Sequence, residues 1–171
     1  MKNIFNIIGF QIGWWTCVLG AARNLPYWGP IVMLLFLAFH FYFFSRDLKE
    51  LKLVLFFAIG GTIIDTGIAY SGLIVYNGPY SFEYLIAPMW ITAMWCGFVA
   101  TINHSMAWLN NKWSFAFLLG AIFGPLSYVT ANKFGAVQFS SSIFTTLLIL
   151  GLIWGASMLA IYWINAKIRF T

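Results

Sequence analysis

Charged residues are scarce in this chain: Asp, Glu, Lys and Arg make up 8% of its 171 residues, whereas 62% are hydrophobic. A soluble domain carries about 25% charged residues, so this sequence has too few charges to cover a water-facing surface. The basic residues are spread over several short segments and form no single patch, which excludes a nucleic-acid-binding protein. The composition therefore predicts a protein embedded in a membrane.

Motifs for metal, disulfide or nucleotide chemistry are missing as well. Cys17 and Cys96 form no CxxC pair, no HExxH zinc motif occurs, and no glycine-rich phosphate loop is present. Both cysteines lie within apolar stretches, so we expect them to pack as small residues without a disulfide. There is no GxSxG nucleophile motif, and His104 and Ser105 would point about 100° apart on a helix. We therefore expect no metal site and no Ser–His catalysis, and no motif identifies a cofactor.

What the sequence has instead is a series of long apolar runs. A helix needs about 20 apolar residues to cross a membrane, and six runs approach that length: residues 4–22, 27–45, 53–76, 85–109, 113–131 and 142–165. They predict an all-α membrane protein, a compact bundle of about six transmembrane helices that forms one polytopic domain over residues 1–171. The first run contains Gln11, Trp14 and Trp15, so we expect a permanent helix and not a cleaved signal peptide.

The basic residues also predict how the bundle is oriented. With six spans both termini lie on one face, and Lys and Arg gather on the cytoplasmic side of membrane proteins. The face of the termini holds Lys2, Arg46, Lys49, Lys52, Lys112, Lys167 and Arg169, against Arg23 and Lys133 on the other. Both termini are therefore expected in the cytoplasm. Segment 46–52 mixes both charge signs and is expected to be a solvated cytoplasmic link, with His40 before it as a capped or snorkelling residue.

Small residues recur at intervals of four in three of these spans. The GxxxG pairs are Gly9 and Gly13, Gly120 and Gly124, and Gly151 and Gly155. Such stripes let helix backbones approach closely, which matters because lipid tails provide no hydrophobic drive between helices. The stripes either pack helices within the chain, which is the preferred interpretation, or form the contact of a homo-oligomer. Pro125, next to Gly124, is expected to kink or break the fifth helix.

Asp65 is the most unusual residue in the spans, because it lies near the centre of the apolar run 53–76. An ionised carboxylate at the bilayer midplane costs several kcal/mol unless it is paired, hydrated or protonated. We expect Asp65 to be the one acidic residue hidden from water, with Gln11 of the first span at a depth where its amide can donate to the carboxylate. Such a buried group either fixes the helix arrangement or belongs to a functional site.

A second group of polar residues lies towards the end of the fourth span. Helical spacing brings its members close to one face of the helix or beside it: Trp90, Thr101, Asn103, His104 and Ser105. His104 is expected about 10 Å nearer the cytoplasm than Asp65, so contact between them requires tilt, a shifted boundary or a water molecule. The candidate catalytic residues are Asp65 and His104, and the candidate ligand-binding residues are Gln11, Trp90, Thr101, Asn103 and Ser105.

These residues leave three kinds of function open. In a lipid-handling protein, with or without enzyme activity, the polar residues bind or protonate a polar group of a lipid, and an opening between helices leads to them. In a small proton-coupled transporter, Asp65 lies at the depth of a transport site and an aqueous pathway reaches it. In a structural or accessory subunit, the polar groups only set the packing of helices.

Several segments, taken in order, resemble a known family. They are Phe10-Gln11 with Trp14, residues 17–22, Asp65, Ala87-Pro88-Met89-Trp90, and residues 101–109, 120–128 and 135–137. Through them nearly the whole chain resembles the bacterial membrane family called domain of unknown function 2878. The resemblance implies a small multi-pass protein of the bacterial inner membrane and no established activity. It also implies an association with lipid-modifying enzymes resembling cyclopropane-fatty-acid synthases, so lipid handling is the leading expectation, with membrane lipids as partners.

Overall fold

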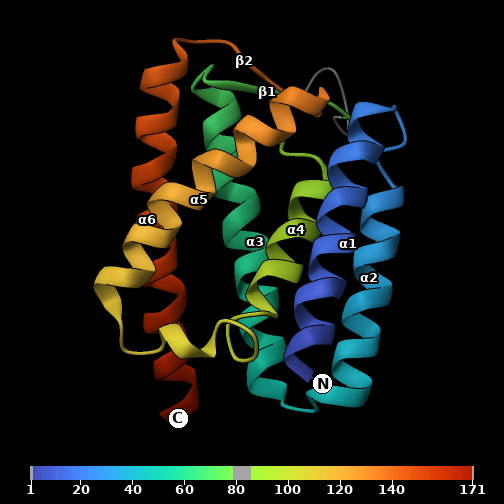
Figure 1. Cartoon of the computed structure of the whole chain (residues 1–171), viewed down its shortest axis with the longest axis vertical. Helices are drawn as coiled ribbons and strands as arrows, with labels where there is room; N and C mark the ends of the chain where they lie inside the picture. The colour runs from blue at the N-terminus through green and yellow to red at the C-terminus, as the bar shows by residue number, and fades with distance from the viewer. Residues whose placement is uncertain (1, 79–85, 171) are drawn as a thin grey trace.

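Helices dominate the computed structural model, which describes residues 2–78 and 86–170 (Figure 1). In chain order the elements are α1 (Lys2–Ala22), α2 (Trp28–Phe39), the π-helical turn η1 (His40–Phe44), α3 (Leu48–Tyr70), β1 (Ile74–Tyr76), α4 (Met89–Val99), the 3₁₀ turn η2 (Ala107–Leu109), α5 (Trp113–Phe134), β2 (Val137–Phe139) and α6 (Ile143–Phe170). The prediction of a helical fold is confirmed, with two short strands that the sequence did not indicate.

Four of the helices, α1, α3, α5 and α6, are long and apolar enough to cross a membrane. Their outer faces carry large exposed apolar side chains, such as Ile59 and Ile63 on α3 and Phe144 and Leu148 on α6. Apolar patches of this extent do not face water on a soluble monomer, whereas lipid tails solvate them well. Length, composition and exposed surface therefore agree that these four helices are able to cross a membrane.

The other two expected spans are shorter than the sequence suggested. Helix α2 with η1 covers Trp28–Phe44, and α4 has 11 residues. At about 1.5 Å per residue α4 rises roughly 16 Å, about half of the hydrocarbon thickness. It ends because Thr101 turns the chain: its backbone N–H bonds the Phe98 carbonyl at 2.9 Å, and its hydroxyl donates to the same oxygen at 2.6 Å. The fourth span predicted over residues 85–109 thus holds a short α-helix, Met89–Val99, and the 3₁₀ turn η2, and Leu85 lies outside the described residues.

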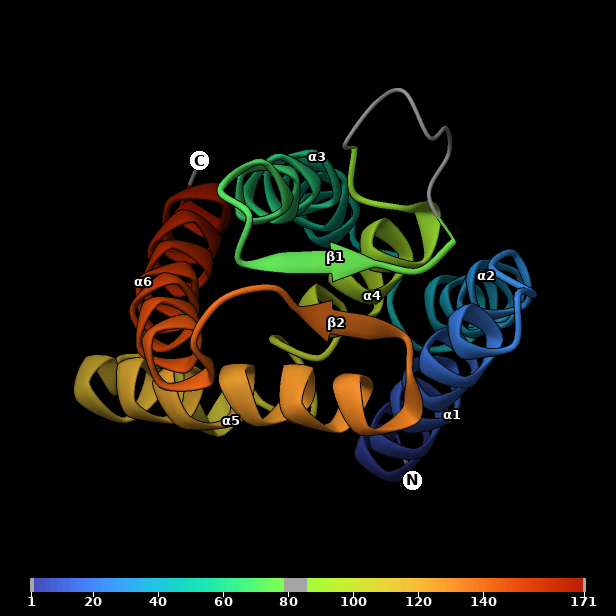
Figure 2. The same ribbon diagram turned by 90° about the horizontal axis from the view of Figure 1, so that it is seen from above.

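Both chain termini lie at the same end of the bundle (Figure 1), which we call the terminus end. The opposite end, the strand end, holds β1 and β2. These strands pair antiparallel, with Ile74 opposite Phe139 and Tyr76 opposite Val137. Figure 2 shows the pair crossing the strand end between α3 and α5. The strands therefore tie the loop after α3 to the loop after α5.

Helix α3 is displaced along the sequence from the predicted run 53–76. It begins at Leu48, because the Asp47 side chain caps it by accepting a hydrogen bond from the Lys49 backbone N–H at 2.8 Å. It ends at Tyr70, six residues early, and residues 74–76 become strand β1. Asp65 consequently lies near the strand end of α3 and not at its centre. The predicted link over residues 46–52 is instead mostly the start of α3: Arg46, Asp47 and Lys52 are exposed, but Glu50 is 4% exposed.

The glycine stripes pack helices within the chain. A methyl group added at Gly9 would collide with Phe36 of α2, and one at Gly13 would collide with Met33. The stripes of α5 and α6 face each other in the same way: Gly120 and Gly124 meet Trp154, Gly151 meets the Ala121 carbonyl, and Gly155 meets Phe117. Packing within the chain was the preferred interpretation of these stripes. A homo-oligomer stays a prediction, and these stripes are already covered by the chain's own helices.

Helix α5 continues through Pro125 without a break. Proline has no N–H, so the carbonyl of Ala121 loses its usual helical partner. Gly151 of α6 packs against that carbonyl, and the lack of a side chain there allows the close approach.

Both cysteines are free, as expected, and Cys17 is buried against Gly29 of α2.

Candidate functional site

A cavity of about 720 Å³ lies between α1, α4, α5 and α6. Its walls are mainly aromatic and aliphatic side chains, including Phe10, Trp14, Met94, Phe98 and Leu119. Along α5 the lining runs from Leu119 to Ala131, which corresponds to about 18 Å at 1.5 Å per residue. The cavity is thus an elongated, largely apolar space, the kind that binds ligands in helix bundles.

The cavity reaches from the outer surface of the bundle to its interior. Trp15, Phe123 and Leu126 line it and are also exposed on the outer faces of α1 and α5. Asp65 and Trp90 line it from within and are buried. The cavity therefore extends from exposed side chains of α1 and α5 to the buried Asp65.

Asp65 is 1% exposed and accepts hydrogen bonds from three side chains. Its Oδ1 accepts from the Tyr76 hydroxyl at 2.6 Å and from the Tyr128 hydroxyl, while its Oδ2 accepts from the Trp95 indole N–H at 2.6 Å. All three partners are neutral donors. Both oxygens of the Asp65 carboxyl group are therefore engaged by donors from β1, α4 and α5.

Small residues allow the wall around Asp65 to form. Gly61 precedes Asp65 by one helical turn, and a methyl group there would collide with the Trp95 indole. The Trp95 ring therefore lies flat against α3 and its N–H reaches the carboxylate. Trp154 of α6 stacks on the other side of Trp95, with ring centroids 4.7 Å apart, and Gly124 makes room for it.

The strand end supplies another donor to Asp65. Tyr76 is the last residue of β1, and the pairing of β1 with β2 turns its side chain into the bundle. Burial, together with the neighbouring Asp65 carboxylate, raises the pKa of the Tyr76 phenol well above its ordinary value. The phenol therefore stays protonated and acts as a hydrogen-bond donor.

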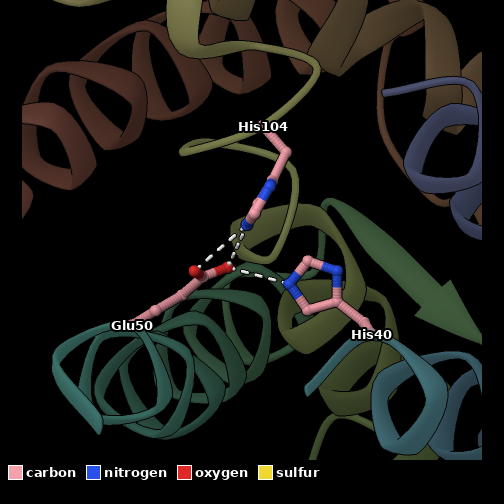
Figure 3. A group of neighbouring side chains, drawn as sticks. All are labelled: His40, Glu50 and His104. Carbon is pink, nitrogen blue, oxygen red and sulfur yellow. Dashed lines mark hydrogen bonds and ion pairs between the residues drawn. The ribbon is translucent and has the colours of Figure 1, made fainter. Parts of the chain in front are cut away.

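A second buried carboxylate lies at the terminus end. Glu50, in the first turn of α3, contacts His40 Nε2 at 2.9 Å and His104 Nε2 at 3.0 Å through Oε1 (Figure 3). Its Oε2 accepts from the Ser45 hydroxyl at 2.5 Å and lies 3.1 Å from His104 Nε2. The two imidazole rings meet edge to face, with centroids 4.6 Å apart. We call these three residues, His40, Glu50 and His104, the His–Glu–His cluster.

The structure does not bring Asp65 and His104 together. Fifteen residues separate Asp65 from Glu50 on α3, which is about 22 Å along the helix. Because α3 begins five residues before the predicted span, Glu50 and not Asp65 lies at the depth of His104. His40 is fully buried in the same cluster, so the expectation of a capped or snorkelling residue at the interface was wrong.

The other predicted site residues divide into two groups. Gln11 and Trp90 line the cavity, with Gln11 exposed at its rim and the Trp90 N–H bonded to the Asn77 carbonyl at 2.8 Å. The remaining three hold the chain after α4: Thr101 bonds Phe98, Asn103 pairs reciprocally with Asn165, and Ser105 donates to Asn6. Those three lie outside the cavity lining.

Five important residues escaped the sequence analysis: Trp95, Tyr76, Tyr128, Glu50 and His40. The aromatic ones resemble any other aromatic residue of an apolar helix, so the sequence carries no local signal for them. Glu50, in contrast, did have a local signal in the sequence. Asp47 followed three residues later by Glu50 is the spacing of a helix N-terminus, which places Glu50 in the first turn of a helix.

Comparison with known proteins agrees with the resemblance seen in the sequence. The model of the family described as protein of unknown function, DUF2878, matches residues 3–160. The chain belongs to this family. The matched region contains the whole cavity lining and the complete His–Glu–His cluster of this DUF2878 protein. No curated protein and no solved structure is detectably similar to the chain.

Proposed function

We propose that this protein resides in the bacterial inner membrane with both termini in the cytoplasm and binds a membrane lipid in the cavity beside Asp65. The excess of basic residues on the face of the termini supports the orientation. The four apolar helices support residence in a membrane. A comparison of membrane lipids in cells tests whether the protein also modifies the lipid it binds.

The observation that carries the proposal is an apolar cavity that opens on the outer face of α1 and α5 and ends at a buried carboxylate. The elongated shape and the mainly apolar, aromatic lining suit an acyl chain. Asp65 and Tyr128 provide a polar wall within the cavity for the polar part of the lipid. A lipid can enter sideways from the bilayer through the gap bordered by Trp15 and Leu126.

The two alternative functions fit this geometry less well. A proton-coupled transporter needs polar groups along an aqueous route, whereas the described lining of this cavity is chiefly apolar. A purely structural subunit has no need of a cavity of about 720 Å³, because well-packed interiors contain few voids larger than a water molecule. Lipid retention by the purified protein and transport in reconstituted vesicles are the measurements that distinguish these alternatives from a lipid-binding protein.

The direct test is to purify the protein in a mild detergent and measure retained lipid by native mass spectrometry. Leu126→Trp fills the mouth of the cavity and is expected to remove most of the retained lipid. Ile122→Trp is the matched control, because Ile122 is 51% exposed and Leu126 is 50% exposed on the same helix, but only Leu126 lines the cavity. Equal lipid retention in the two variants would contradict a lipid site in this cavity.

The cellular test compares membrane lipids in a deletion strain that carries the wild-type protein, Asp65→Asn or His104→Ala at matched expression. A lipid species that follows the wild type and is lost with Asp65→Asn supports a role in lipid chemistry and identifies the substrate class. Unchanged lipids in all strains, with stable variant proteins, would rule out a lipid-modifying enzyme. Transport in reconstituted vesicles that depends on Asp65 would then favour the carrier.

A further inference from the structure

The His–Glu–His cluster lies outside the cavity and has no part in the proposed lipid site. Its residues come from three segments that are distant in the sequence: η1, the first turn of α3, and the turn after α4 (Figure 3). One ligand atom from each residue lies within 4.8 Å of the other two. We propose that His40, Glu50 and His104 bind a divalent transition-metal ion of the zinc type.

The chemistry of the three side chains fits such an ion. Two imidazole nitrogens and one carboxylate are a ligand set that zinc sites use, particularly those that keep a fourth position open. Zinc–nitrogen and zinc–oxygen bonds of about 2.0–2.1 Å in a tetrahedron separate neighbouring ligand atoms by roughly 3.3 Å. Glu50 Oε1 lies 2.9 Å from His40 Nε2 and 3.0 Å from His104 Nε2. Outward movements of a few tenths of an ångström bring both Glu50 pairs to this spacing, and all three ligand atoms lie within 4.8 Å of one another.

The surroundings resemble those of a supported metal site. Ser45 holds the second carboxylate oxygen of Glu50 at 2.5 Å and fixes its orientation, as outer partners of metal ligands do. His40 and Glu50 are buried, whereas the His104 side chain is 15% exposed. The exposed edge of His104 leaves a route from outside to the open fourth position. Water or an anionic group of a ligand fits there, because one carboxylate balances only half of the charge of a divalent ion.

Hydrogen bonds within the cluster do not satisfy all of its polar atoms. Nδ1 of His40 is buried and has no hydrogen-bond partner among the described residues. With zinc on Nε2, this Nδ1 carries the ring proton and does not touch the ion, so the support for zinc comes from the three ligand atoms and their spacing. Sequence spacing gave no sign of this site, because its histidines are 64 residues apart and Glu50 lies in a charged run.

The test uses the full chain purified without a histidine tag. The chain has two histidines, both in the cluster, so every imidazole ligand must come from this site. The protein is equilibrated with Zn²⁺, freed of loose ions and analysed by elemental mass spectrometry and X-ray absorption. We expect a single zinc ion for each chain, with nitrogen and oxygen ligands. A chain that retains no zinc, or zinc bound by the cysteine sulfurs, would overturn the proposal.

Three variants in the segment between α4 and α5 locate the ion. His104→Ala is expected to abolish stoichiometric zinc retention, and Asn110→Ala, an exposed residue nearby, is expected to preserve it. His104→Cys replaces the imidazole by a thiolate ligand and is expected to restore zinc with one sulfur in the X-ray absorption spectrum. Zinc retention that is unchanged by His104→Ala would place the ion elsewhere and overturn the assignment. These variants leave the cavity intact, so lipid retention reports separately on the proposed function.

Discussion

Helix α3 carries two buried carboxylates, and their surroundings differ in kind. Asp65, near the strand end, receives hydrogen bonds from two phenols and an indole, all neutral donors from β1, α5 and α4. Glu50, at the terminus end, meets two imidazoles and a hydroxyl. The indole N–H can only donate, and both phenol hydroxyls donate to Asp65 here. An imidazole can donate, accept, carry a charge or bind a metal ion.

The difference suggests two different roles on one helix. The donors around Asp65 hold an acceptor in a fixed geometry beside an apolar cavity, which suits recognition of a ligand. The partners of Glu50 can change their hydrogen-bonding state, which suits a site whose occupancy changes. Both carboxylates are almost completely buried, so the difference between the two sites comes from their partners and not from burial.

The largest expected effect comes from exchanging each acid for its amide. In Asp65→Asn the amide oxygen keeps the bond from Trp95, but the NH₂ group replaces the oxygen that accepts from the Tyr76 and Tyr128 hydroxyls. Those buried hydroxyl donors lose their acceptor, so we expect about 3 kcal/mol less stability. In Glu50→Gln an imidazole can switch tautomer and accept from the amide, so we expect a loss of about 1 kcal/mol. Unfolding in mixtures of a mild detergent and dodecyl sulfate measures both. Equal losses would show that the two environments are equivalent.

The next effect concerns the contact that places Trp95 against Asp65. Gly61→Ala introduces a methyl group that collides with the Trp95 indole, so we expect a loss of about 2 kcal/mol from overpacking. Gly60→Ala is the matched control, because a methyl group there meets nothing within 4 Å. Alanine favours a helix over glycine by about 1 kcal/mol, so the control is expected to be neutral or slightly stabilised.

Tryptophan fluorescence separates a local change from a general one. If Gly61→Ala moves Trp95, its emission changes while the helical circular dichroism of the protein stays the same. An equal change of stability in Gly60→Ala and Gly61→Ala would show that glycine itself, and not the room for Trp95, matters at this turn.

The sequence was sufficient for the parts of the fold that depend on composition and periodicity. Apolar runs located every long helix, and the glycine stripes indicated close helix packing. Asp65 was recognisable because a lone acid in an apolar run is costly. The donors around Asp65 were not, since a tyrosine that donates to a carboxylate looks the same in sequence as one that packs against lipid.

The site at Glu50 was missed for a different reason. Its charged neighbours suggested a solvated link, because residues 46–52 were interpreted as one segment. In the structure Glu50 of the first helical turn points inward. Burial of a charged residue depends on partners that arrive from elsewhere in the chain, here His40 and His104. The cap formed by Asp47 was the single local signal that this run begins a helix.

The smallest expected effect tests that cap. Asp47→Ala removes the side-chain acceptor of the Lys49 N–H, so we expect a loss of about 1 kcal/mol, whereas Asp47→Ser is expected to preserve most of the stability. If the cap also sets where α3 begins, Asp47→Ala loosens the first turn and speeds amide hydrogen exchange around Glu50, while exchange around Asp65 stays unchanged. Equal acceleration at both carboxylates would mean that the helix responds as one unit, and the two sites would then be coupled through α3.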